Sequence, residues 1–184
     1  MRRISVVGNS GSGKSTLAAQ LAAALSIPHL ELDGVFHQPG WQPLPAAEFR
    51  AAVAAFAAGR AWVIDGNYSA VQDLVWARAD TVVWLDPSRA RVMRQLVPRT
   101  LLRIARRTEL WNGNRESWVN LLRASPEESI LRWAWTQHAR TRERYQRARA
   151  DPAWAHLEFV RLATPAQVAA FARQARARPG SDAA

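Results

Sequence analysis

Short apolar runs alternate with longer helix-forming stretches along this chain. The runs typical of buried strands cover residues 3–7, 28–33, 61–64, 81–85 and 156–162. Helices are expected over residues 17–25, 46–58, 88–107, 126–149 and 165–176, with a break or kink at Pro98. Strands that alternate with helices form a parallel sheet covered on both faces. The pattern therefore predicts an α/β fold with a five-stranded parallel sheet.

Polar residues follow four of the expected strands. Ligands of such sheets bind at the carboxyl ends of the strands. Here those ends carry Gly8, Asp33, Asp65 and Asp86. We therefore expect a glycine-rich loop and three carboxylates at one edge of the sheet. Asp86 stands just before an expected helix and is interpreted as its cap.

Residues 8–15 match the phosphate-binding pattern G-x-x-x-x-G-K-S, the Walker A motif or P-loop, between a strand and a helix. Glycines let backbone N–H groups turn toward phosphate oxygens, and the helix N-terminus attracts the anion. Lys14 is expected to reach the β- and γ-phosphates, and the Ser15 hydroxyl to bind Mg²⁺. The motif predicts a nucleoside triphosphate site. Its expected nucleotide contacts are Gly8, Asn9, Ser10, Gly11, Ser12, Gly13, Lys14, Ser15 and Thr16.

Two of the strand-end carboxylates are candidates for chemistry. Asp65 follows an apolar strand, as does a Walker B residue that holds Mg²⁺ through water. A turn role is the alternative, because Gly66 and Asn67 come next. Asp33 precedes a loop rich in Pro and Gly and is placed to act as a general base or to orient an acceptor. An ordinary loop carboxylate is the alternative for Asp33, and Trp41 in the same loop is a candidate wall of the acceptor site.

The net charge of +10 lies in one part of the chain, because residues 89–149 hold fifteen Arg and five Glu. Guanidinium groups neutralise the charge that phosphoryl transfer spreads over three oxygens. An arginine-rich lid that closes over the nucleotide is one interpretation, and a solvated helix face is the other. The arginines expected at the phosphates are Arg99, Arg103, Arg107, Arg115 and Arg140.

Composition excludes several classes of protein. The absence of cysteine rules out a disulfide scaffold, a thiolate nucleophile and an iron–sulfur cluster. No secretion signal and no apolar stretch long enough for a bilayer is present, so a soluble cytoplasmic protein is expected. A basic surface can bind nucleic acid or a small polyphosphate, and charge alone does not choose between them.

Several stretches together are shared with a known group of proteins. They are 8–16, 32–34 with 39–41, 63–68, 85–86 and 99–116. Through them the chain resembles the adenylate-kinase-like P-loop kinases and, more narrowly, the bacterial DNA topology modulation proteins. The resemblance covers most of residues 1–170.

The resemblance implies a sheet in the order 2-3-1-4-5, ATP as phosphoryl donor and adenine binding near residues 163–165. It also implies an arginine-bearing lid at about 103–118 within a single P-loop kinase domain over 1–178, which a frayed tail at 179–184 follows. One departure concerns the acceptor. Adenylate kinases carry arginine in their monophosphate-binding segment, whereas residues 28–47 here contain none, which weakens the case for AMP.

Three functions are consistent with these features. The leading hypothesis is a kinase that transfers phosphate from Mg-ATP to a nucleotide or a hydroxyl-bearing metabolite. A nucleotide-gated switch without turnover comes second. An ATP-dependent nucleic-acid-binding protein that acts on DNA topology through the surface of residues 89–149 comes third, because no DNA-binding motif is present.

Overall fold

A computed structural model describes residues 1–116 and 130–177 of the chain. Its main sheet has five parallel strands in the order β2-β5-β1-β6-β7. The strands are β1 (Arg3–Gly8), β2 (His29–Glu31), β5 (Trp62–Asp65), β6 (Thr81–Leu85) and β7 (Glu158–Leu162). Counted along the chain, these five strands stand in the expected order 2-3-1-4-5.

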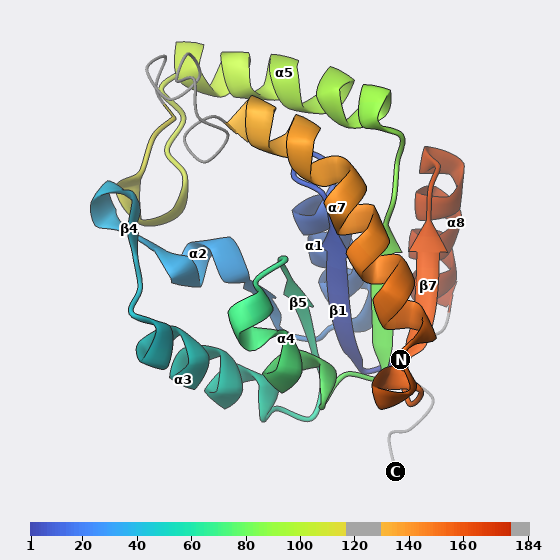
Figure 1. The fold of residues 1–184 in the computed structure, drawn as a ribbon. Coiled ribbons are helices and arrows are strands. Elements are labelled where there is room, and N and C mark those ends of the chain that lie inside the picture. The colour runs from blue at the N-terminus through green and yellow to red at the C-terminus, as the bar shows by residue number, and fades with distance from the viewer. Residues whose placement is uncertain (117–129, 178–184) are drawn as a thin grey trace.

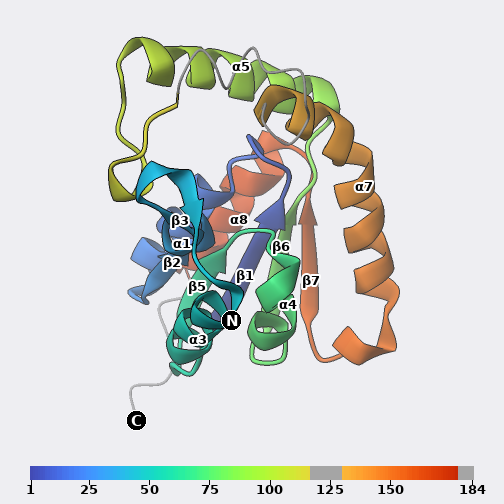
Figure 2. The same ribbon diagram turned by 60° about the vertical axis from the view of Figure 1, so that its left-hand side comes forward.

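Helices cover both faces of this sheet (Figures 1 and 2). One face carries α1 (Lys14–Leu25) and α8 (Pro165–Ala177), which contact each other. The other face carries α3 (Ala46–Ala57), α4 (Ser69–Trp76) and α7 (Ile130–Ala150). The sequence pattern did not predict α4. The expected start of the helix over 126–149 lies outside the described residues.

Alternation along the strands sends apolar side chains to both faces. On β1, Ile4 and Val6 pack toward α1 and α8, while Val7 joins the cluster under α3 and α4. On β6, Val83 and Trp84 separate in the same way. The central strands are therefore buried on both sides, which explains why they read as continuous apolar runs.

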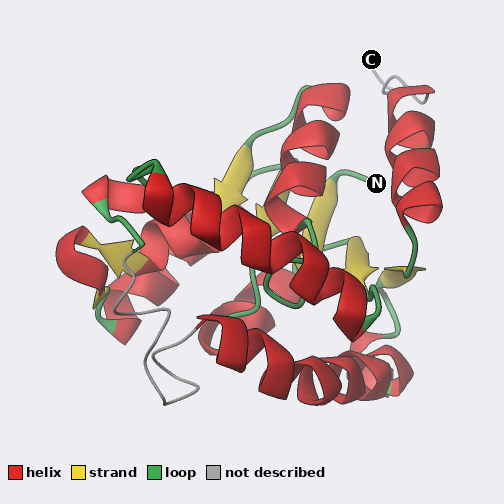
Figure 3. Cartoon of the chain, turned by 90° about the horizontal axis from the view of Figure 1, so that it is seen from above, coloured by secondary structure: helices red, strands yellow, loops and turns green. Residues whose placement is uncertain are grey.

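Helix α5 (Arg89–Ala105) crosses above the carboxyl ends of the strands (Figures 1 and 3). Ser88 caps it, since its Oγ accepts a hydrogen bond from the Arg91 N–H at 3.4 Å. The helix continues through Pro98, so it is not broken there. Its buried Leu96 packs against the P-loop, where a Cβ on Gly11 would lie 3.0 Å from the Leu96 Cβ. This contact places the arginine-bearing helix directly over the predicted nucleotide site.

The segment expected as a breaker-rich loop contains short elements. The strand expected over 28–33 ends at Glu31, and α2 (Leu32–Phe36) begins at the next residue. A small hairpin follows, with β3 (His37–Gln38) paired to β4 (Gln42–Pro43) around the 3₁₀ turn η1 (Pro39–Trp41). Asp33 therefore lies in the first turn of a helix and not at a strand end.

Two further 3₁₀ turns, η2 (Trp111–Gly113) and η3 (Pro152–Trp154), complete the described elements. Residues 117–118 of the expected lid and the expected tail at 179–184 fall outside the described part of the chain. None of the helices in the described ranges is long and apolar enough to cross a membrane.

Candidate active site

The loop between β1 and α1 has the backbone that its glycines predict. Gly8 and Gly13 adopt φ values of 145° and 96°, and a Cβ on Gly8 would lie 2.4 Å from the Leu85 carbonyl oxygen. Gly13 is the N-cap of α1 and supplies no side-chain hydrogen bond to the first turn. The free N–H groups of that turn therefore remain available to an anion at the positive end of the helix dipole.

Lys14 lies among the charged groups of this loop. Its Nζ donates to the Asn9 carbonyl oxygen at 3.2 Å. Burial lowers the pKa of Lys14, while the carboxylates of Asp33, Asp65 and, more weakly, Glu31 act to raise it. The lone lysine of the sequence is thus held at the entrance of α1 within the electrostatic reach of three carboxylates.

The Ser15 hydroxyl faces two of these carboxylates. Its Oγ lies 2.7 Å from Asp65 Oδ2 and also 2.7 Å from Glu31 Oε1. A hydroxyl has one hydrogen and can donate it to one carboxylate at a time. Three oxygen donors gathered in this way suit a hard divalent cation, and Mg²⁺ is usually held by one or two carboxylates together with substrate phosphates. The residues present therefore fit Mg²⁺.

Side chains behind these carboxylates fix their orientation. His29 Nε2 lies 3.0 Å from Asp65 Oδ1, and the indole Nε1 of Trp111 donates to Glu31 Oε2 at 2.8 Å. Asp65 itself is buried, with 2% of its surface exposed. Among the residues with described side chains, no group of three or more His, Cys, Asp or Glu could hold a metal ion.

Glu31 was not among the candidates from the sequence. The strand was expected to extend to Asp33, so Asp33 and not Glu31 was predicted to be the carboxylate at its end. Because side chains alternate along a strand, His29 and Glu31 project to the same side of β2, toward Asp65 on the neighbouring β5. A strand boundary placed two residues earlier would have identified Glu31 as the strand-end carboxylate.

Asp33 lies within electrostatic reach of Lys14 and is held by an aromatic hydroxyl. Tyr68 Oη donates to Asp33 Oδ1 at 2.6 Å and lies 3.4 Å from His37 Nε2. Burial, reinforced by Asp33, raises the pKa of the Tyr68 phenol, which therefore stays protonated as a donor. Burial lowers the pKa of His37 against the opposing pull of Asp33. The result is a carboxylate with a fixed orientation beside a partly buried imidazole.

Residues 111–115 dock onto the acceptor-side segment 31–41. The Asn112 amide donates to the carbonyl oxygens of Gly34 and His37, and the Asn114 amide donates to that of Gln38. Asn114 Oδ1 accepts from the Trp41 N–H at 2.8 Å. These side-chain amides replace a sheet ladder and join two parts of the chain that are distant in sequence.

Aromatic rings fill the same junction. Trp111 stacks on His37 at a centroid distance of 6.0 Å, and Trp41 meets both rings edge-on. A Cβ on Gly34 would lie 2.9 Å from the Trp111 ring, so the absence of a side chain there allows the close approach. Trp41, expected as a wall, thus lies in one aromatic cluster with His37, beside the Tyr68–Asp33 pair.

Two of the expected arginines come near the carboxylates. Burial lowers the pKa of Arg99, the neighbouring Arg103 lowers it further, and Glu116, Asp33 and Glu31 oppose the shift. Arg99 is nevertheless exposed over its surface as a whole. Arg103 pairs with Glu116 at 3.5 Å, and burial raises the pKa of that carboxyl despite the pairing. Helix α5 therefore brings the Arg99 charge toward Lys14 and Asp33.

The other expected arginines point elsewhere or stand alone. Arg115 is exposed and lies 3.9 Å from Glu109 across the bridge that closes residues 109–115. Arg107 follows the end of α5, and Arg140 lies on α7; both are exposed. Neither side chain forms a hydrogen bond or ion pair with another residue of the described ranges. The structure does not gather these three arginines with Arg99.

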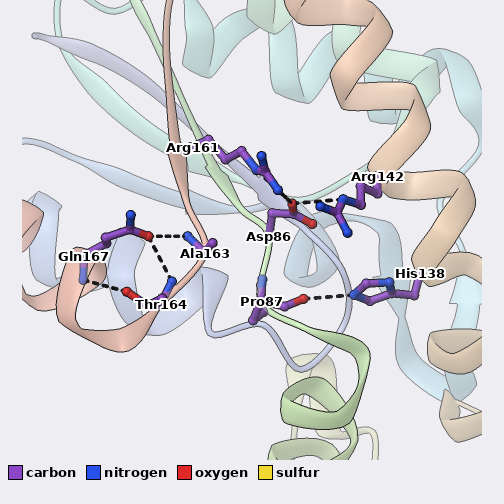
Figure 4. A network of polar contacts seen from close by, with 8 residues as sticks. All are labelled: Asp86, Pro87, His138, Arg142, Arg161, Ala163, Thr164 and Gln167. Atoms are coloured by element: carbon purple, nitrogen blue, oxygen red, sulfur yellow. Dashed lines mark hydrogen bonds and ion pairs between the residues drawn. The ribbon is translucent and has the colours of Figure 1, made fainter.

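Asp86 is not the helix cap that the sequence suggested. The cap position belongs to Ser88, and the Asp86 carboxylate instead accepts hydrogen bonds from Arg161 Nε and Nη2 at 2.8 and 2.5 Å (Figure 4). Arg142 of α7 adds an ion pair at 3.3 Å. Asp86 directly follows β6, which pairs with β7, so a cation from that neighbouring strand reaches it before any helix N–H does.

The segment expected near adenine forms the start of α8. Gln167 Oε1 accepts hydrogen bonds from the N–H groups of Ala163 and Thr164, while Thr164 Oγ1 accepts from the Gln167 N–H (Figure 4). This reciprocal arrangement is a capping box. It shapes the backbone of residues 163–165 without using the charged network at Asp86.

A further residue missed from the sequence clamps the P-loop. The Asn67 side chain accepts from the Gly8 N–H at 3.1 Å and donates to the Gly8 carbonyl oxygen. Tyr145 of α7 in turn donates to Asn67 Oδ1 at 2.9 Å. Asn67 had been considered only as a turn former after Asp65, because a side chain that pairs with a distant backbone group leaves no local pattern.

Comparisons with known proteins place the fold. No family model and no curated protein matches the chain. A gluconokinase from Sinorhizobium meliloti matches in structure with a TM-score of 0.52 and 22% identity, covering 96% of this chain and 90% of that one. A shikimate kinase from Acinetobacter baumannii in complex with shikimate matches with a TM-score of 0.55 and 16% identity, covering 95% of this chain and 90% of that one. A shikimate kinase from Bacteroides thetaiotaomicron matches with a TM-score of 0.52 and 17% identity, covering 94% of this chain and 95% of that one. The chain therefore has the fold of P-loop small-molecule kinases, and none of these matches supports the narrower resemblance to DNA topology modulation proteins.

Proposed function

We propose that this protein is a kinase that transfers the γ-phosphoryl group of Mg-ATP to a hydroxyl group of a small molecule. The observation that carries the proposal is the convergence of Ser15, Asp65 and Glu31 at the entrance of α1, with Asp33 held separately beside Lys14. The first group of residues suits a metal–phosphate complex, and the second suits a hydroxyl acceptor. The shared fold with a gluconokinase and shikimate kinases supports the same assignment.

The roles follow from position and charge. The free N–H groups at the start of α1 bind phosphate oxygens, and the Lys14 ammonium neutralises the β- and γ-phosphates. Ser15, Asp65 and Glu31 would hold Mg²⁺, which when bound neutralises charge that builds up on the phosphates. Arg99 faces the transferring group from α5. Positioning and electrostatic stabilisation are the main requirements of phosphoryl transfer.

Asp33 acts on the acceptor. Its carboxylate accepts the hydrogen of the acceptor hydroxyl and aligns the oxygen for attack. The bond from that oxygen to the γ-phosphorus forms as the bond from the γ-phosphorus to the β–γ bridging oxygen breaks. ADP leaves with the electron pair, and the hydroxyl proton passes to Asp33 and then to solvent. Tyr68 keeps Asp33 oriented by donating its single hydroxyl hydrogen to Asp33 Oδ1.

ADP release from Mg-ATP tests the proposal. Wild type and Lys14→Ala are incubated in separate wells with pooled nucleosides, nucleoside monophosphates, sugars, sugar acids or duplex DNA. Arg147→Ala is the matched control, because Arg147 is exposed and pairs only with Glu143 on the helix surface. A Lys14-dependent rise with one small-molecule pool supports the kinase. A rise with DNA alone contradicts it and favours a nucleic-acid-dependent ATPase.

A further inference from the structure

Apart from residues 111–115, the acceptor side of the site is built from segments without lysine or arginine. Neither residue occurs between Lys14 and Arg50, or between Arg60 and Arg78, although 25 of the 184 residues are Lys or Arg. These two gaps contain β2, α2, the small hairpin, β5 and all of α4, together with most of α1 and the first turn of α3. They supply Asp33, His37, Trp41 and Tyr68, so the wall that surrounds the predicted base carries no permanent positive charge.

Apart from Arg99, the described cations that border this wall have anionic or carbonyl partners, including Arg115, which lies 3.9 Å from Glu109. Arg50 forms a two-pronged pair with Asp73, at 3.0 and 2.8 Å. Arg144 of α7 donates to the Asn67 carbonyl oxygen and to Gln72. Arg103 pairs with Glu116. Arg99 is the exception. Its charge acts on Lys14, and in the proposed reaction both cations lie beside the transferring phosphate.

What the wall offers instead is hydrogen-bonding and aromatic surface. Asp33 is an acceptor, and His37 Nδ1 is a buried nitrogen without a hydrogen-bond partner in the described ranges. Because burial lowers the pKa of His37, the imidazole is neutral at pH 7. The Trp41 and Trp111 rings supply flat faces next to it.

From this wall we infer that the acceptor is a hydroxyl compound without phosphate or carboxylate, which presents its hydroxyl to Asp33 and a flat or apolar face to Trp41 and Trp111. The inference rests on the proposed function. An anionic acceptor would add its charge to those of Asp33 and Glu31, while Arg99 and Lys14, the described cations in electrostatic reach of these carboxylates, neutralise the transferring phosphate in the proposed reaction. An uncharged one meets groups that hydrogen-bond and stack. The γ-phosphoryl group then moves to the neutral hydroxyl as described for the proposed reaction.

Matched pairs of acceptors that differ in charge test this inference. We would measure kcat/KM for adenosine against AMP, thymidine against its 5′-monophosphate, glucose against gluconate, and methyl shikimate against shikimate. The expected result is at least a tenfold higher kcat/KM for the uncharged member of the pair that turns over. A higher value for an anionic member overturns the inference, as does Lys14-dependent turnover confined to anionic members.

The same assay separates the two proposals. If no pair gives turnover above the level of Lys14→Ala, the proposed function fails, and the inference fails with it. If turnover depends on Lys14 but is faster with acceptors that carry a phosphate or a carboxylate, the proposed kinase function is supported and only the inference of an uncharged acceptor is overturned.

A charge placed in the wall provides a second test. His37→Arg introduces a guanidinium beside Tyr68 and Asp33, whereas Gln42→Arg adds the same charge at an exposed site of the hairpin. We expect His37→Arg to shift the ratio of KM values within a pair at least tenfold toward the anionic member, and Gln42→Arg to leave it unchanged. Thermal melts confirm that both variants fold. An unchanged ratio in folded His37→Arg overturns the placement of the acceptor at this wall.

Discussion

The nucleotide side and the acceptor side of this site are built by different means. The nucleotide side uses one continuous motif: Gly8 to Ser15 bring a turn, a free helix N-terminus, the single lysine and a hydroxyl into place within one loop. The acceptor side is assembled from α2, a hairpin with two-residue strands, Tyr68 after β5, and residues 111–115, which are joined by side-chain amides and aromatic rings. Local backbone geometry shapes the first, and long-range contacts shape the second.

This difference explains how each side handles charge. Phosphate groups bind to cations and N–H groups. On the proposed nucleotide side, the P-loop provides Lys14 and free N–H groups, and α5 provides Arg99. The acceptor wall carries carboxylates, a neutral imidazole and indoles, although the protein as a whole is strongly basic. Glu31 joins the two sides, because one carboxylate oxygen faces Ser15 and the other accepts from Trp111.

The largest expected effect comes from the nucleotide side. Lys14→Ala removes the ammonium that neutralises the transferring phosphate in the proposed reaction, and kcat/KM for Mg-ATP should fall by about 10²–10³-fold, the scale of losing one preorganised charge-stabilising group. Steady-state ADP release measures the loss. Arg147→Ala should retain wild-type rates, and equal losses in the two variants would contradict a specific role for Lys14.

On the acceptor side, Asp33→Asn keeps the shape but removes the base. We expect kcat to fall by about 10²-fold or more, while the KM for ATP stays close to that of wild type because the P-loop is untouched. Asp73→Asn is the surface control, since Asp73 is exposed and pairs only with Arg50. A fall in ATP affinity equal to the fall in kcat would show that the two sides are not separable.

The residue shared by both sides gives an intermediate effect. Glu31→Gln retains the hydrogen bond to Trp111 through its amide oxygen but loses a negative charge at Ser15. The Mg²⁺ concentration needed for half-maximal binding of ATP should rise about tenfold, within the range seen when groups around a metal are altered. Titration of Mg²⁺ into protein and ATP by calorimetry measures it, with Glu48→Gln as control because the Glu48 side chain is exposed on α3. An unchanged Mg²⁺ requirement would exclude Glu31 from the metal site.

The smallest effect is a pH dependence on the acceptor side. Since burial lowers the folded-state pKa of His37 below its ordinary value of 6.5, the unfolded chain binds a proton first as the pH falls. This group therefore costs no stability above pH 6.5 and reduces the free energy of unfolding below it. His37→Gln should make that free energy less dependent on pH between 7 and 5, as urea titrations would detect. An identical slope in both proteins would contradict a neutral, partly buried His37.

The same contrast governs what could be predicted from the sequence. The five strands, the P-loop backbone and the position of Asp65 at the end of β5 were predictable, because strand periodicity and the spacing of the motif are local signals. Glu31 was missed because the β2 boundary was set two residues too late. The roles of Asn67 and Trp111 depend on partners about 60 and 80 residues away in sequence, and no periodicity encodes those contacts. The prediction that Asp86 caps a helix was wrong for the same reason, because its partner Arg161 comes from the neighbouring strand β7.

Transfer of labelled phosphate tests the central claim most directly. ATP labelled at the γ-position is incubated with wild type or Lys14→Ala and the uncharged acceptors, and the products are separated by chromatography. The account predicts that wild type moves the label into a new phosphorylated small molecule and that Lys14→Ala does not. Label found only as inorganic phosphate, or left entirely in ATP while ATP is still bound, would contradict it.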